Sequence, residues 1–181
     1  RFQLRPDAPP NDLVIHVKML DKNNQLQQQA IGILGVNMLY ACYNFHDQPE
    51  ILLESLIDSL RGRIKIDMVR LTGPDFEEVD NRHLSLMLVK QLTEAAMFNE
   101  KGQIVHPSEF LYRKNLMVVR GSFRPATLVN MDMIKTAYKQ FREDAGTDAH
   151  KCFLLTEITM DNLVSDGDLD EKDFLDRADL L

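Results

Sequence analysis

The chain has 181 residues, of which 44% are hydrophobic and 27% are charged, so we expect a folded protein with a sizeable core and exclude a disordered one. Its formal net charge of -7 excludes broad binding to nucleic acid or to an anionic membrane, although a local basic loop can still hold a phosphate. Cys42 and Cys152 lie in apolar runs without metal-ligand spacing, which favours buried free thiols in a cytoplasmic protein over a disulfide.

Residues 1–12 carry three prolines and two aspartates, a composition typical of an extended lead-in. The chain begins with an arginine, and its last residues still follow an apolar period, so we expect a piece of a longer polypeptide. Nowhere does the sequence approach the roughly 20 consecutive apolar residues that span a bilayer, and we expect no contact with membranes.

Residues 13–20 alternate apolar and polar side chains, which predicts a strand with His16 on its polar face. The segment 25–45 has apolar residues at helical spacing. Gly32 and Gly35 each lower the stability of such a helix by about 1 kcal/mol relative to Ala, so a strand in part of this segment is the alternative.

From Pro49 onward the predicted elements follow closely on one another. Pro49 suits the first turn of a helix, and Asp80 is the expected N-cap of another. The expected elements are a helix over 49–60, a strand over 63–71, a turn at 72–75, a helix from 79 or 80 to about 93, a short strand at 95–98, a turn at 99–102, a short helix from 107, a strand at 116–119, a helix over about 129–143, a strand at 152–158 and a terminal helix capped by Asp170.

From residue 63 onward strands alternate with helices, which predicts right-handed crossovers on a mostly parallel sheet. We therefore expect an α/β fold of three layers, a mostly parallel sheet with helices on both faces, in a Rossmann-like arrangement. Residues 13–181 are expected to form this fold as a single domain. Ligands in such a fold bind beyond the carboxyl ends of the strands, where three loops are expected: 72–82, 120–130 and 156–162.

The loop 120–130 is the most informative of these, because a strand, a glycine, two arginines and a helix start coincide in it. Gly121 and Ser122 can expose N–H donors at the start of a helix, and Arg120 and Arg124 can neutralise a phosphate. The alternative is a turn glycine, solvated arginines and a proline that merely introduces the helix.

Other polar residues are weaker candidates for a functional site. Glu157 at a strand end suits a general base or a metal ligand, but an ion pair with Arg120 or Arg124 is the favoured interpretation. The five histidines show no triad or metal spacing, so we expect ordinary polar residues and no metal site formed by the protein.

The segment 121–133 resembles the opening signature of the nucleotidylyltransferase superfamily, which includes nicotinamide and nicotinate mononucleotide adenylyltransferases. In that signature a strand is followed by G-x-F-x-P, then by [HT]-x-G-H and a helix. Gly121, Phe123, Pro125 and Thr127 match it, whereas Val129 replaces the glycine and Asn130 the final histidine. The chain also resembles a family of bacterial proteins, some of them named adenylyltransferases, with segments similar to those at 32–37, 79–82 and 120–125.

The resemblance implies a nucleotide- or phosphate-binding domain that can transfer an adenylyl group from ATP to a mononucleotide, with Mg²⁺ neutralising the pyrophosphate that leaves. Asn130 would take the place of the histidine that contacts the phosphates, and it can donate a hydrogen bond but carries no charge. The implied site consists of Asn130 and Arg124 as catalytic residues, with Arg120, Gly121, Ser122, Phe123 and Thr127 holding the nucleotide.

The missing histidine, and the absence of the superfamily's later signature I-S-x-T-x-x-R, favour an alternative. In it the chain is a structural or protein-interaction domain of a larger bacterial protein and binds no nucleotide. Its partners would be a second copy of the chain or the remainder of the longer polypeptide. For this chain we favour a binding domain without catalytic activity over an enzyme.

Overall fold

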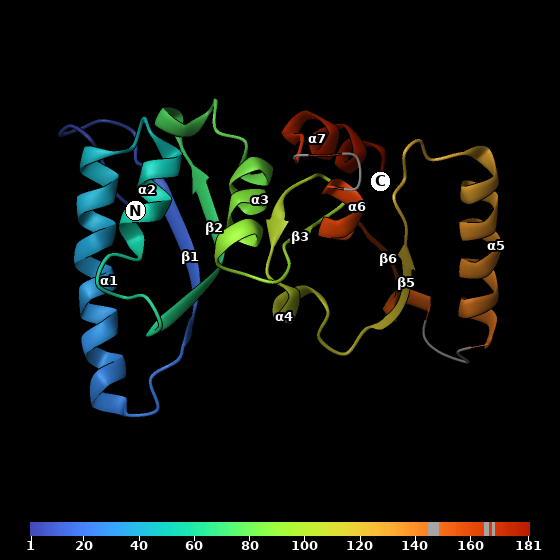
Figure 1. Ribbon diagram of the computed structural model, residues 1–181, viewed down its shortest axis with the longest axis horizontal. Coiled ribbons are helices and arrows are strands. Elements are labelled where there is room, and N and C mark those ends of the chain that lie inside the picture. The colour runs from blue at the N-terminus through green and yellow to red at the C-terminus, as the bar shows by residue number, and fades with distance from the viewer. Residues whose placement is uncertain (145–148, 165–166, 168) are drawn as a thin grey trace. The chain divides into compact units, whose positions relative to one another are not determined.

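The structure, a computed structural model, describes residues 1–144, 149–164, 167 and 169–181. Contacts cluster the chain into two compact units, Arg1–His106 and Pro107–Leu181, each with its own helices and strands (Figure 1). This division cuts the segment 13–181, which we expected to be one domain. Within the described ranges, no helix is both long and apolar enough to cross a membrane.

The first unit combines helices with two small antiparallel sheets, in which β1 pairs with β2 and β3 pairs with β4. The β1–β2 ladder runs from Asp12 opposite Thr72 to Met19 opposite Ile64. In chain order the elements are β1 (Asp12–Met19), α1 (Asn24–Asn44), α2 (Pro49–Leu56), β2 (Ile64–Thr72), the 3-10 turn η1 (Pro74–Phe76), α3 (Asn81–Gln91), β3 (Met97–Phe98) and β4 (Ile104–Val105).

The core of this unit is formed by apolar side chains of β2 and of the helices packed near it. Leu52 and Leu56 of α2, Ile66 and Leu71 of β2, and Leu84 of α3 are each 1% exposed or less. Burying one such side chain contributes about 1.5–3 kcal/mol, so this cluster is the main source of the unit's stability.

Two polar side chains fix the start of α3 beside β2. Asn81 Oδ1 accepts a hydrogen bond from the Leu71 amide at 2.7 Å, and its Nδ2 donates to the Leu71 carbonyl at 2.9 Å. Asp80 is the N-cap, as predicted, and accepts from the Arg82 amide at 2.8 Å. Burial raises the pKa of the Asp80 carboxyl, but the hydrogen bonds and charge of Arg82 outweigh burial and lower the pKa overall.

Residues 1–12 fold back on themselves, where we expected an extended lead-in. Phe2 and Asn11 exchange both backbone hydrogen bonds, at 2.9 and 2.8 Å. Asn11 is fully buried, and its Nδ2 donates to the Asp75 carboxylate at 2.6 Å. Gly73, with φ 131°, lies against Asn11, where a Cβ would come within 2.7 Å of the Asn11 Cα. The segment is therefore part of the folded unit.

The second unit contains one parallel strand pair, β5–β6, with Asn115 opposite Cys152 and Arg120 opposite Glu157. In chain order its elements are α4 (Pro107–Phe110), β5 (Asn115–Arg120), α5 (Leu128–Asp144), the 3-10 turn η2 (Ala149–Lys151), β6 (Cys152–Glu157), α6 (Met160–Val164) and α7 (Glu171–Leu180). Cys42 and Cys152 are both buried and free, as expected, and burial raises the pKa of the Cys42 thiol.

The mixed α/β class is confirmed, but the described residues form three two-stranded sheets and not one mostly parallel sheet. The prediction assumed that each helix crosses over between parallel neighbours. Two of the three pairs are antiparallel instead. Helices α1 and α2 connect strands that run in opposite directions, and Asn99 closes the β3–β4 hairpin by accepting hydrogen bonds from the amides of Lys101 and Gln103. The segment 25–45 is helical, so its strand alternative is wrong.

Candidate functional site

The sequence-predicted loop leaves the end of β5, and its first residues contact β6. Arg120 donates to both Glu157 carboxylate oxygens, at 3.0 and 3.1 Å, and the Gly121 amide donates to the Glu157 carbonyl at 3.1 Å. The favoured interpretation of Glu157 as an ion-pair partner is confirmed. These contacts continue the strand pairing by one residue and occupy the Gly121 amide that we expected to face a phosphate.

Phe123 turns its ring back into the loop. It is 8% exposed and has a φ of 48°, and its ring atoms lie 3.3 to 3.6 Å from the position that a Cβ on Gly121 would take. A side chain at position 121 would therefore push against the ring. This packing gives Gly121 and Phe123 a structural role.

Thr127 and Asn130 form a reciprocal cap at the start of α5. The Thr127 amide donates to Asn130 Oδ1 at 3.0 Å, and the Asn130 amide donates to Thr127 Oγ1 at 3.2 Å. This is the pattern of a capping box, with Asn in the place of the usual Glu or Gln. The Asn130 side-chain oxygen thus satisfies the backbone of its own helix.

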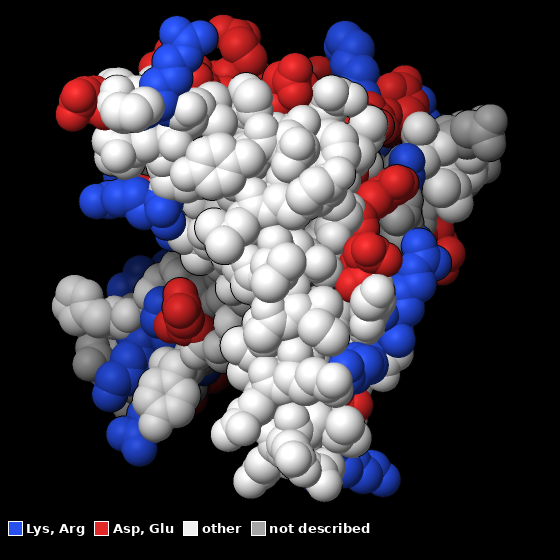
Figure 2. Space-filling view, turned by 90° about the vertical axis from the view of Figure 1, so that its left-hand side faces the viewer, with Lys and Arg blue, Asp and Glu red and all other residues white. Residues whose placement is uncertain are grey.

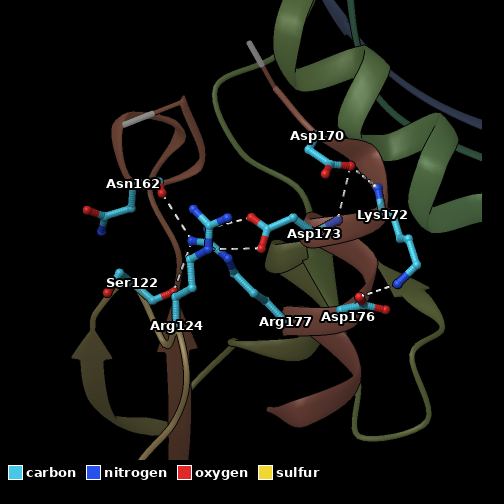
Figure 3. A network of polar contacts seen from close by, with 8 residues as sticks. All are labelled: Ser122, Arg124, Asn162, Asp170, Lys172, Asp173, Asp176 and Arg177. Carbon is cyan, nitrogen blue, oxygen red and sulfur yellow. Dashed lines mark hydrogen bonds and ion pairs between the residues drawn. The ribbon is translucent and has the colours of Figure 1, made fainter. Parts of the chain in front are cut away.

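Arg177 of α7 is the centre of a polar network in the second unit, and Figure 3 shows its guanidinium facing Asp173 of its own helix, the loop residue Ser122 and Asn162 of α6. Although charged, the residue is only 2% exposed. Its Nη1 donates to the carbonyls of Ser122 and Asn162, both at 3.0 Å, and its Nη2 pairs with the Asp173 carboxylate. The Nε of Arg124 lies 3.4 Å from the same carboxylate.

Arg177 is not among the residues that the sequence predicted for a site. Its sequence signal is a charged residue three positions after Phe174, on the apolar face of the terminal helix, where both side chains are buried. A lone arginine in such a position needs acceptors from elsewhere in the fold, because burying a charge without partners is costly. The carbonyls of Ser122 and Asn162 are those acceptors.

The polar residues of the loop 120–130 thus lie close together, but they contact other residues of the protein. Arg120 faces Glu157, Arg124 faces Asp173, Asn130 caps α5, and the Ser122 carbonyl faces Arg177. Adenylyl transfer with ATP and Mg²⁺ stays a prediction. These contacts account for the same residues without a nucleotide.

His16, Asp67 and His106 lie together in the first unit, although the spacing of the histidines predicted no cluster. Each contributes a possible ligand atom within 4.8 Å of the others. The three residues come from positions far apart in the sequence, so local spacing could not reveal them. They are the group of metal-ligating side chains found in the described part of the chain.

Helix α1 has an unusual exposed face. None of its 21 residues is Asp, Glu, Lys or Arg. Its outward side exposes large apolar side chains, and Figure 2 shows on this side of the molecule a band without Lys, Arg, Asp or Glu, bordered by charged residues. The most exposed of them are Ile31, Val36, Leu39, Tyr40 and Tyr43, each between 51% and 66% exposed.

No protein family model, curated protein or solved structure matches this chain. The function therefore has to be inferred from the residues themselves, beginning with the exposed face of α1 and the cluster around Asp67.

Proposed function

We propose that the chain is a protein-interaction domain that pairs with a second copy of itself through the outer face of α1. The single observation that carries this proposal is a 21-residue helix that is uncharged and apolar on both sides. A helix that is hydrophobic all round is normally covered all round. The inner side of α1 is covered by its own unit, where Ala30, Leu34 and Ala41 are buried. We therefore expect a partner to cover the outer side.

The outer face has the spacing of a helix-pairing seam. Gly32, Val36, Leu39 and Tyr43 follow one another in alternate steps of four and three residues, the repeat by which two helices interlock. Gly32 and Gly35 leave open space, since a Cβ on either would meet nothing within 4 Å. Such a gap can accept a side chain from the facing helix.

The uncharged α1 face permits a second copy as the occupant. The chain carries a net charge of -7, so two copies repel each other over most approaches. The α1 face bears no acidic residue and avoids that repulsion. A two-fold pair places the same apolar seam on both sides, which makes the surface its own complement.

A recess beside Tyr43 extends this face. Its volume is about 670 Å³. It gives a protruding side chain of the facing copy a place to enter, in the manner of the anchor residues that dominate interfaces. Its lining is mixed, with the apolar residues Phe2, Leu4, Pro6, Pro10 and Tyr43 and the polar residues Arg1, Gln3 and Arg5.

Light scattering on the full chain and two matched variants tests the proposal. Leu39→Glu places a charge in the seam at a residue that is 63% exposed, so its own unit should tolerate the change. Leu128→Glu makes the same change on α5, at a residue that is 89% exposed. We expect the mass of two chains for the parent and for Leu128→Glu, and the mass of one chain of 20.9 kDa for Leu39→Glu. A parent of single-chain mass, or a Leu39→Glu variant that stays paired, contradicts the proposal.

Nucleotide or phosphate binding at the loop 120–130 is a second candidate. It is favoured by one observation, that the loop joins a strand of a parallel pair to the start of the 17-residue helix α5. Binding requires Arg124 to leave Asp173. If ATP or a mononucleotide raises the melting temperature of the parent but not of Arg124→Ala, nucleotide binding at the loop is supported. If no nucleotide changes the melting temperature, nucleotide binding is excluded.

A further inference from the structure

We infer that His16, Asp67 and His106 form a binding site for one divalent transition-metal ion, with Zn²⁺ as the best match. The inference is independent of α1 pairing, because it rests on other residues and another face of the β1–β2 sheet. Two imidazoles and one carboxylate are a donor set that zinc takes in sites with three protein ligands and one open position.

The geometry already brings the donor atoms close together. Asp67 Oδ1 lies 2.6 Å from Nδ1 of His16, and its Oδ2 lies 3.4 Å from Nε2 of His106. The two imidazole rings stack with their centroids 3.6 Å apart. Ligand atoms around a tetrahedral zinc are about 3.4 Å apart, since each lies about 2.0–2.2 Å from the metal. Coordination requires the His16 ring to move away from Asp67 and to turn out of its stack on His106, because a metal ion lies in the plane of each imidazole that binds it.

A β-bulge places Asp67 on the same side of the sheet as His16. In the β1–β2 ladder His16 is opposite Met68 while Val17 is opposite Ile66, so Asp67 is the extra residue. As a result both Asp67 and Met68 lie outside the core cluster. Core-facing residues of β2 change from even to odd positions across the bulge: Ile64 and Ile66 before it, Val69 and Leu71 after it. Bulges often re-aim a side chain in this way at functional sites.

The site combines a protected side with an open one. The side chain of His106 is 12% exposed and that of Asp67 is 24% exposed, so both are held by their surroundings. The side chain of His16 is 42% exposed, which gives a metal ion and a water ligand access from solvent. Three protein ligands with an accessible fourth position are the arrangement in which zinc binds and activates water.

Metal titration of the full chain tests the site. Calorimetry with Zn²⁺ measures stoichiometry and affinity, and the visible spectrum of added Co²⁺ reports a low-symmetry site with nitrogen and oxygen ligands. The ligand variants are His16→Gln, Asp67→Asn and His106→Gln. The control is His150→Gln, which removes an exposed histidine of the second unit.

We expect one Zn²⁺ per chain for the parent and the control, and a loss of affinity of about tenfold or more in each ligand variant. Asp67→Asn keeps the shape of the side chain, and circular dichroism without metal checks that each variant remains folded. The site is contradicted if the parent binds no Zn²⁺ or Co²⁺. It is equally contradicted if the folded ligand variants bind as tightly as the parent, because the ion then lies elsewhere.

Discussion

In the unit Arg1–His106 the buried side chains are mainly aliphatic and lie in one cluster, whereas in Pro107–Leu181 the most buried of the described side chains is that of an arginine. The second unit has few buried apolar residues among those described: Phe123, Cys152, Leu163 and Phe174. The first unit is therefore held by apolar burial, and the second depends on hydrogen bonds from Arg177 to the carbonyls of Ser122, in a loop, and of Asn162, in α6. Substitutions should act differently in the two units.

The helices α1 and α5 repeat this contrast on the surface. Both expose apolar side chains, but α5 also carries Lys135, Lys139, Arg142 and Glu143, and α1 carries no charge. Charged residues on a helix surface discourage apolar association, because they must lose water when a partner covers them. If α1 pairs with a second copy as we propose, α5 is the matched control helix, because it exposes apolar side chains together with charged ones.

Removing the buried arginine should have the largest effect. Arg177→Ala leaves two carbonyls without their donor and Asp173 with Arg124 as its remaining cation, and breaking a buried charge pair costs about 3–5 kcal/mol. We expect the second unit to open, with faster hydrogen exchange in β5 and α7 and little change in β2.

The matched control for this change is Lys172→Ala on the same helix. Lys172 pairs with Asp176 in an exposed i,i+4 contact, which contributes little. An exchange pattern that is the same in both variants would show that Arg177 does not hold the unit together.

An apolar truncation in the other unit should be nearly as severe. Leu56→Ala opens a cavity at a fully buried residue and should lower the free energy of unfolding by about 2–5 kcal/mol. Ile51→Ala, at a residue of the same helix that is 42% exposed, should cost much less. Urea denaturation measures both, and equal losses would argue against the apolar cluster as the source of stability.

Asn81→Ala tests a polar contact within the apolar unit. It leaves the Leu71 amide and carbonyl without their side-chain partner and should cost about 1–3 kcal/mol. Asn44→Ala removes one exposed hydrogen bond of α1, to the Tyr40 carbonyl, and serves as the control. A loss for Asn81→Ala no greater than for the control would mean that solvent replaces these bonds.

The smallest effect concerns pH. The pKa of Asp80 is lowered in the folded chain, so its contribution to stability is present above the unfolded value of about 3.9 and is lost as the pH falls through the folded value. Asp80→Asn keeps a cap but not the charge, and should cost well under about 1 kcal/mol near neutral pH because the carboxylate is partly exposed. Urea midpoints of the two proteins should converge in acid, and a constant difference would exclude Asp80 as the titrating group.

The sequence predicted most helices and strands correctly because apolar spacing and N-caps are local properties. Asp80 and Asp170 were both predicted as caps and both cap their helices. It predicted the parallel pairing of β5 and β6 across α5, but it did not predict the antiparallel pairs, because pairing depends on contacts between distant segments. The alternation from residue 63 onward indicated parallel crossovers, yet β2 pairs antiparallel with β1.

The site residues show the same limit. The loop at 120–130 was found because its glycine, arginines and helix start are adjacent in the sequence, but their partners Glu157, Asp173 and Arg177 are not. The cluster at Asp67 was missed because its histidines are remote. Its one signal in the sequence was that the alternation of apolar and polar residues in β2 is interrupted by two adjacent apolar residues, Met68 and Val69, next to the bulge.

Pairing through α1 is tested most directly by sedimentation velocity of the full chain over a dilution series. The account predicts a sedimentation coefficient that falls from that of a pair to that of one 20.9 kDa chain as the protein is diluted, with Leu39→Glu at the lower value throughout. A parent chain that sediments as one 20.9 kDa species at every concentration would contradict it.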